Sequence, residues 1–196
     1  MDKRSFLATA AWGGLALSSQ ANAAPKGRSV NSPALLTLTG AIAKANRGPL
    51  DPALDQMMVK QKVTFDKART FEFSELAAMP RKAIKPTLEY DSKRHELAGP
   101  LLVDILKAAG AALTDSTRLQ MRAVDGYSPS ISVADARRQG FIVATHLDGK
   151  PMPLGGLGPL WAVYEPDRFP DMTAKPVSER FALCPWGLYH IEVLAS

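Results

Sequence analysis

The chain has 196 residues, and its 24 Lys and Arg residues against 19 Asp and Glu give a net charge of +5. The basic residues are scattered and have no aromatic interleaving, which argues against a nucleic-acid-binding module. The single cysteine, Cys184, excludes an internal disulfide, and with three scattered histidines it offers no zinc-ligand spacing. The length suits one domain with a core of its own.

The first residues have the pattern of a secretory signal peptide. A charged start is followed by a short apolar run over residues 6–17 and by the small-residue site Ala21-Asn22-Ala23. We therefore expect residues 1–23 to be a signal peptide, residues 24–33 a polar leader and residues 34–196 a single domain. The expected location is periplasmic or secreted, and we expect no membrane span once the signal is removed.

The first part of the domain reads as strands and one short helix. Residues 34–40 alternate and end at a glycine, which predicts a strand. Two shorter segments, Val63 to Phe65 and Phe71 to Phe73, also read as strand. Ser74 is a suitable N-cap for a helix over residues 75–79, which Pro80 would end.

The central stretch, residues 86–112, joins a short strand to a helix. Thr87 to Tyr90 reads as a strand end, and the polar run from Asp91 to His95 follows it. Apolar residues then recur at spacings of three and four on one helical face: Leu101, Leu102, Ile105, Leu106 and Ala109. Pro100 suits the first helical turn, and Gly110 suits a C-cap. Loops between a strand and a helix often carry functional side chains, although this one could equally be a solvated loop.

The remainder continues the mixed pattern, so the fold class is α+β. Alternation predicts a strand over residues 118–124, followed by the turn Asp125-Gly126-Tyr127. The later elements in chain order are a strand start at 131–133, a helix at 134–139 closed by Gly140, a buried strand at 141–145, a hairpin-type turn at 147–153, a glycine loop entering a strand at 155–164, a surface excursion at 165–177 and a terminal strand at 189–194.

Several of these motifs together resemble the sulfite oxidase-like molybdopterin-binding domain. The matching pieces are Thr-Leu-Glu-Tyr, a polar run with arginine, Ala-Gly-Pro-Leu-Leu-Val-Asp-Ile-Leu, Val-Asp-Gly-Tyr, Leu-Asp-Gly-Lys-Pro-Met-Pro and Gly-Pro-Leu-Trp-Ala-Val-Tyr. They occur in the order of that family over roughly residues 34–194. The resemblance implies a molybdopterin-binding fold of mixed sheets and barrel-like strands with short helices.

Tyr90 stands where the resemblance implies the cysteine that ligates molybdenum. A tyrosine phenol is a hard oxygen donor that ionises near pH 10, so it does not replace a soft thiolate. Cys184 lies in another motif, too far along the chain to be assigned the role of that ligand. We therefore expect no molybdenum in this protein.

The pocket of that fold could still bind a pterin-type or molybdopterin-like ligand. A flat pterin ring needs an aromatic or apolar face to stack on, and donors and acceptors along its edge. The candidate binding residues in the matching segments are Tyr90, Arg94, His95, Asp125, Tyr127, Trp161 and Trp186. Each also has an ordinary interpretation, since tryptophans pack in cores and arginines are solvated.

Three functions remain open from the sequence. The first is an exported, non-catalytic pterin-binding protein that reports its ligand to a membrane signalling protein, such as the cyclic-di-GMP cyclase or phosphodiesterase that the resemblance suggests. The second is a molybdopterin-dependent oxidoreductase with unusual metal ligation. The third is a scaffold or subunit that uses the fold only for protein contact. No Ser/His/Asp spacing and no pair of carboxylates points to a hydrolase.

Overall fold

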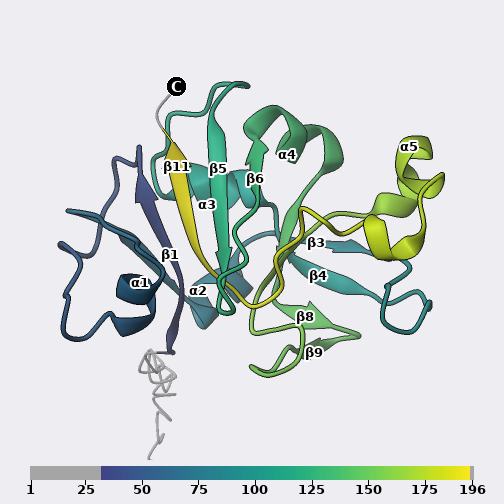
Figure 1. The fold of residues 1–196 in the computed structure, drawn as a ribbon, viewed down its shortest axis with the longest axis horizontal. Coiled ribbons are helices and arrows are strands. Elements are labelled where there is room, and N and C mark those ends of the chain that lie inside the picture. The colour runs from purple at the N-terminus through teal and green to yellow at the C-terminus, as the bar shows by residue number, and fades with distance from the viewer. Residues whose placement is uncertain (1–31, 195–196) are drawn as a thin grey trace, which may run out of the picture. The chain divides into compact units, whose positions relative to one another are not determined.

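Of the sheets in the described residues, the one with most strands has five, in the order β2-β1-β11-β5-β6 (Figure 1). At its centre β11 (Leu188–Leu194) runs parallel to β1 (Ala34–Gly40) and antiparallel to β5 (Arg118–Ala123). The outer strands are β2 (Arg69–Glu72) and β6 (Ser130–Ser132). The first and last strands are therefore neighbours, and the sheet needs both ends of the described chain.

The computed structural model describes residues 32–194. The expected signal peptide and all but the last two residues of the expected leader lie outside these residues. Within residues 32–194, no helix is both long and apolar enough to span a bilayer.

Three short helices bury their apolar sides in the same core as the sheet. On β1 the inward residues are Leu36 and Leu38, which alternate with the polar Thr37 and Thr39. Helix α3 (Leu102–Ala108) contributes three fully buried side chains, and α2 (Phe73–Ala78) and α4 (Val133–Gln139) contribute others. The helix α1 (Gln56–Lys60) instead packs Met58 into a small separate cluster.

Two further sheets complete the fold. One has the order β3-β4-β8-β9, with β3 (Arg81–Ile84), β4 (Leu97–Pro100), β8 (His146–Leu147) and β9 (Lys150–Pro151). The other pairs β7 (Ile142–Ala144) with β10 (Trp161–Val163). After β10 come two 3-10 turns, η1 (Pro166–Arg168) and η2 (Val177–Glu179), on either side of α5 (Pro170–Thr173). The described residues thus form a mixed fold of mostly strands with a few short helices, as the α+β prediction has it.

The structure corrects four details of the sequence reading. Pro100 ends the strand β4 and does not begin a helix, because a strand end tolerates the missing N–H. Tyr90 lies in a turn, and not at a strand end. The segment 63–65 is not a strand, since Val63 packs beside α1 instead. Ser74 lies inside α2, whose N-cap is Glu72.

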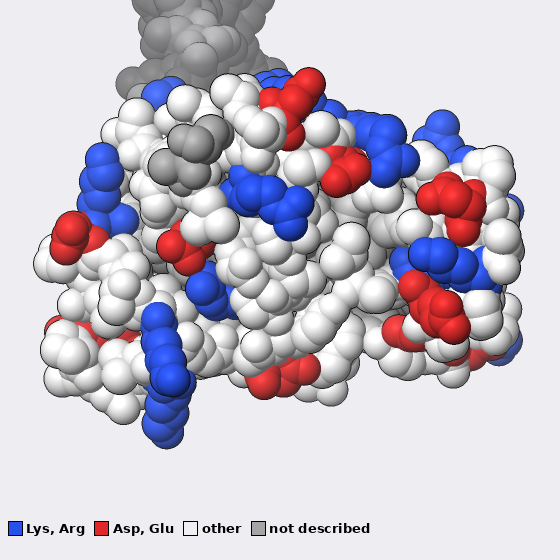
Figure 2. Space-filling view, turned by 45° about the horizontal axis from the view of Figure 1, so that its top comes forward, with Lys and Arg blue, Asp and Glu red and all other residues white. Residues whose placement is uncertain are grey.

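The surface charge is mixed. On the face shown in Figure 2, lysines and arginines lie among aspartates and glutamates, and neither sign forms a continuous patch. This distribution agrees with the scattered basic residues of the sequence.

One glycine allows two strands to approach closely. A Cβ atom on Gly99 of β4 would lie 1.9 Å from the carbonyl oxygen of Val143 in β7. We predict that Gly99→Ala lowers the free energy of unfolding by about 2 kcal/mol or more, because the strands must separate to admit the methyl group. Gly48→Ala is the matched control, since a Cβ there meets nothing within 4 Å. Equal urea midpoints for the two variants would contradict this prediction.

Candidate functional site

The segment 184–188 connects the two-stranded sheet to the central sheet. The indole Nε1 of Trp161 donates to the carbonyl oxygen of Cys184 at 2.9 Å. The backbone N–H of Leu188 donates to the carbonyl oxygen of Leu160, also at 2.9 Å. These bonds hold the residues before β11 against β10, and a hollow remains between this segment and the end of β5.

That hollow is a cavity of about 170 Å³, which we call the aromatic cavity. It is lined by Glu89, Tyr90, Ala123, Asp125, Tyr127, Trp161, Ser178, Phe181, Ala182, Cys184 and Trp186. A second cavity of about 330 Å³ adjoins it and shares Tyr90 and Trp186. This glycine-loop cavity is otherwise lined by Val124 and the segment 154–158. Together the two cavities have the size of a small-molecule site.

The aromatic side chains differ in how deeply they lie. Trp161 is only 1% exposed, and its ring centroid lies 5.8 Å from that of Phe181. Tyr127 is 48% exposed, and its hydroxyl donates to the carbonyl oxygen of Ala182 across the cavity wall. Trp186 is half-buried and belongs to both cavities. Trp161 and Phe181 therefore form the fixed inner wall, and Tyr127 and Trp186 lie nearer to solvent.

Tyr90 joins the two cavities and stays protonated. The residue is 58% exposed, but partial burial and then the nearby Glu89 carboxylate raise the pKa of its phenol to about 12. At neutral pH its hydroxyl is therefore a hydrogen-bond donor and not a phenolate.

Cys184 lines the same cavity as Tyr90, although the two are far apart in the sequence. Distance along the chain was therefore a poor guide to the position of this residue. The side chain is 3% exposed, and burial raises the pKa of its thiol. The group is a neutral thiol at physiological pH, which is a poor metal ligand and a poor nucleophile.

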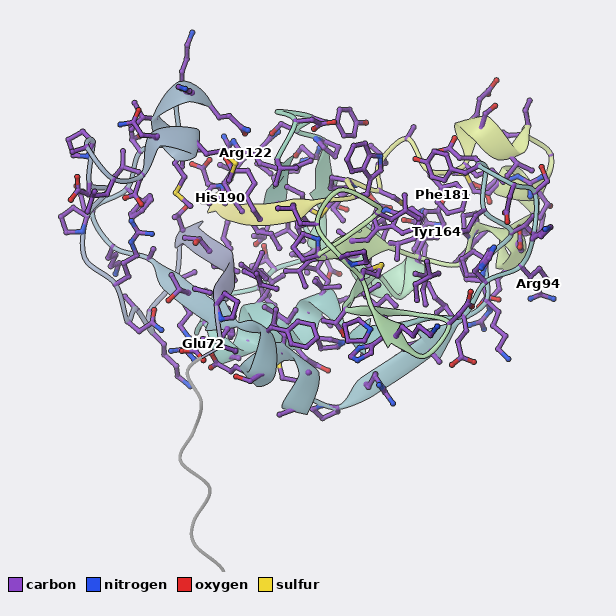
Figure 3. The ribbon with its side chains drawn as sticks, turned by 90° about the horizontal axis from the view of Figure 1, so that it is seen from below. Glu72, Arg94, Arg122, Tyr164, Phe181 and His190 are labelled. Carbon is purple, nitrogen blue, oxygen red and sulfur yellow. The ribbon has the colours of Figure 1, made fainter. Side chains whose placement is uncertain are left out.

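Arg94 does not reach either cavity. Its Nε donates to the carbonyl oxygen of Lys85 at 3.0 Å, and its Nη2 lies 3.4 Å from Glu165 Oε1. Figure 3 shows it at the edge of the molecule, away from Phe181 of the cavity wall. The expectation that this guanidinium contacts a ligand in the pocket therefore has no support from its position.

His95 also lies outside the cavities and supports the loop that carries Tyr90. Its Nε2 is 3.0 Å from Asp91 Oδ2, and its Nδ1 is 2.7 Å from Asp148 Oδ2. The second oxygen of Asp148 accepts from the backbone N–H of Glu96 at 2.9 Å. The bond to Asp148, followed by that to Asp91, raises the pKa of His95. These contacts attach the loop to the β8–β9 hairpin.

The structure thus brings together five of the seven predicted residues: Tyr90, Asp125, Tyr127, Trp161 and Trp186. Sequence reasoning missed Glu89, Ser178, Phe181, Cys184 and the segment 154–158. Glu89 directly precedes Tyr90, and Cys184 lies two residues before Trp186. Nearness in the sequence to these two predicted residues is therefore the signal that could have found them. Ser178 and Phe181 lie in a stretch with no motif.

A second buried polar group lies away from the cavities. On the central sheet His190 is fully buried, with Nε2 2.9 Å from Thr39 Oγ1 and Nδ1 3.2 Å from Arg122 Nη1 (Figure 3). Burial, with a smaller effect of Arg122, lowers the pKa of His190 to about 3. Because arginine only donates, Nδ1 accepts and Nε2 carries the proton. This histidine is a neutral part of the core.

The opposite pKa shifts of His95 and His190 predict pH effects on the unfolding free energy that can be separated. A raised pKa means that His95 stabilises the fold below its unfolded pKa of about 6.5, and that this contribution is lost as pH rises through the folded pKa. We predict that His95→Gln costs more unfolding free energy at about pH 5.5 than at about pH 8.5. The measurement is urea unfolding of the variant and the wild type at both pH values. The unfolding free energies of the two proteins are subtracted at each pH, because the contribution of His190, which has the opposite pH dependence, is present in both and cancels.

Lys107→Gln is the control for this experiment. It removes an exposed ion pair in which Lys107 Nζ lies 3.2 Å from Asp104 Oδ1 on α3. Its cost should be the same at both pH values. A His95→Gln cost that is independent of pH would show that the histidine does not act through its charge.

Comparison with known proteins gives the fold only. No protein-family model matches the chain, and no curated protein matches it. A solved structure of the sulfane dehydrogenase SoxCD from Paracoccus pantotrophus matches with a TM-score of 0.53 and 13% identity. The match covers 82% of this chain and 38% of that chain, so this chain corresponds to less than half of it. At this identity the likeness supports a distant sulfite oxidase-like fold.

Proposed function

We propose that this protein is a non-catalytic binding protein for a pterin-type ring, held where the aromatic and glycine-loop cavities meet. The observation that carries the proposal is the convergence of aromatic side chains and two carboxylates from four separate segments on one hollow. The likeness to a solved structure supports only the fold, so the proposal rests on the lining residues.

The face of the ring would contact Trp186 and Tyr90, the two side chains that belong to both cavities. Both are partly accessible, so a flat ligand can reach them without opening the core. Trp161 is 1% exposed and bonded to the Cys184 carbonyl, so it closes the inner end rather than serving as a stacking platform. Offset stacking on Trp and Tyr suits an electron-poor ring.

The polar side chains of the cavity would form hydrogen bonds with the edge of the ring. A pterin presents an amino group and a ring N–H side by side, which form a donor pair for one carboxylate. Glu89 and Asp125 are the carboxylates that line the aromatic cavity. The Tyr90 and Ser178 hydroxyls line the same cavity and can donate to the ring's carbonyl and nitrogen acceptors.

The same lining does not fit a molybdenum centre. The cofactor of this fold supplies redox chemistry through a metal that needs a soft thiolate from the protein. The lining instead offers a phenol with a pKa of about 12 and a buried neutral thiol. We therefore assign no redox step to these residues.

Export and a membrane signalling partner are part of the same proposal. The N-terminal pattern of residues 1–23 supports export. Support for a partner comes from the cavity mouth, where Tyr90, Tyr127 and Leu154 are 58%, 48% and 73% exposed. Exposed apolar side chains around a ligand site give a partner a surface that changes when the ligand binds. Purification of the signal-processed chain from the periplasm, with any bound membrane protein, tests both points.

Removal of the shared indole should weaken binding. We predict that Trp186→Ala reduces the affinity for neopterin about three- to tenfold, because one stacking surface is lost. The measurement is isothermal titration calorimetry on the mature chain. Arg94→Ala is the matched control, because this side chain lines neither cavity and contacts Lys85 and Glu165 instead, and its affinity should equal that of wild type. Equal affinities for wild type and Trp186→Ala would remove the stacking assignment.

Metal analysis separates the proposal from an oxidoreductase. We predict that protein purified from its native compartment holds far less than one molybdenum per chain, while the same sample yields an extractable pterin. Stoichiometric molybdenum that disappears in Cys184→Ala would favour an enzyme in which this thiol is an unexpected ligand. A sample with neither component and no uptake of added pterins would favour a scaffold.

A further inference from the structure

The charged side chains that line the two cavities are all acidic. Glu89 and Asp125 line the aromatic cavity, and the glycine-loop cavity has no charged lining residue among those that the structure describes. The chain as a whole has the opposite balance, with a net charge of +5. A site that receives an anion normally supplies arginine, lysine or a helix N-terminus to it.

Two arginines in segments next to the cavity lining are engaged elsewhere. Arg180, two residues from Ser178 of the lining, bonds Asp167 Oδ1 at 3.1 Å and the carbonyl oxygens of Lys175 and Thr173 at 3.0 and 3.1 Å. Arg94 is held by Lys85 and Glu165. Neither guanidinium belongs to the cavity lining, so neither offsets the carboxylates from inside the site.

The charge of Glu89 acts on the interior of the aromatic cavity. It raises the pKa of the Tyr90 phenol and also that of the buried Cys184 thiol, after the larger effect of burial in each case. Both shifts disfavour a negative charge at these positions. The aromatic walls act in the same direction, because the faces of Trp, Tyr and Phe rings attract cations.

From this geometry we infer that the site takes a planar heteroaromatic ligand without a phosphate or carboxylate group, neutral or cationic, and rejects its phosphorylated counterpart. The inference rests on the proposed pterin-binding function and narrows it. Molybdopterin and other pterin phosphates would then be excluded by their own charge, independently of the missing thiolate.

The first test compares a matched pair of ligands. Neopterin and neopterin 3′-monophosphate differ only in the phosphate, and calorimetry on the mature chain gives both affinities at neutral pH and low salt. We expect the phosphate to cost about tenfold or more, because two carboxylates within several ångströms repel it, and added salt should reduce the difference. Equal affinities, or tighter binding of the phosphate, would overturn the inference and leave the proposed function standing.

A designed cation should reverse the preference. Ser178 is an exposed residue of the cavity lining, and its hydroxyl has no hydrogen-bond partner among the described residues. Ser178→Lys therefore places an ammonium group at the site without breaking a described contact. This variant should bind the phosphorylated pterin more tightly than wild type does. Ser178→Gln is the matched control, because it adds similar bulk without charge and should leave the phosphate disfavoured. An unchanged phosphate affinity in Ser178→Lys would count against the inference.

If neither pterin binds, a second measurement distinguishes failure of the charge inference from failure of the proposed pterin-binding function. Ser178→Cys is labelled with a cationic reagent, trimethylammonium-ethyl methanethiosulfonate, and with an anionic one, sulfonatoethyl methanethiosulfonate. The ratio of the cationic to the anionic labelling rate is compared with the same ratio for free cysteine. Wild type is the blank for Cys184. A ratio raised severalfold toward the cationic reagent supports a negative site potential even without a pterin ligand, in which case only the proposed function fails. A ratio equal to that of free cysteine overturns the charge inference.

Discussion

The central position of β11 is the constraint on which the rest of the structure depends. This strand pairs with β1 on one side and with β5 on the other, so its register with these two strands determines how the strands of the five-stranded sheet are aligned. The cavity walls extend from the same point, because residues 184–187 lead directly into β11 and the turn 124–127 leaves the end of β5 beside it. The site is therefore built where long-range pairings meet, and no single local motif contains it.

Local patterns predicted the fold where burial follows a simple period. Alternation identified β1 and β5, and the three-and-four spacing identified α3, whose C-terminal glycine has the expected positive φ of 69°. The reading failed where tertiary contacts override the local pattern. Val63 is apolar because it packs beside α1 and Tyr189, and Pro100 is tolerated because it stands at a strand end.

Much of the candidate site followed from motifs, but its charge did not. Aromatic residues such as Trp186 and Tyr127, which belong to the matching motifs, do line the cavity. Arg94 and His95 contact Glu165 and Asp148, acidic partners far away in the sequence, and neither side chain lines a cavity. Cys184 shows the converse, since a residue from a distant motif lies beside Tyr90. An acid-only lining in a basic chain can be recognised only in three dimensions.

The positions of the tryptophans give the molecule an optical property. Of its three tryptophans, Trp161 and Trp186 fall within the described residues, and both line the aromatic cavity. The third, Trp12, belongs to the segment that signal processing would remove. In the processed chain every indole would then report on this one site. Since Trp161 is fully enclosed and Trp186 is not, the two should emit at different wavelengths, and a bound ring that absorbs near their emission would quench both. The indole fluorescence of the processed chain would then measure cavity occupancy.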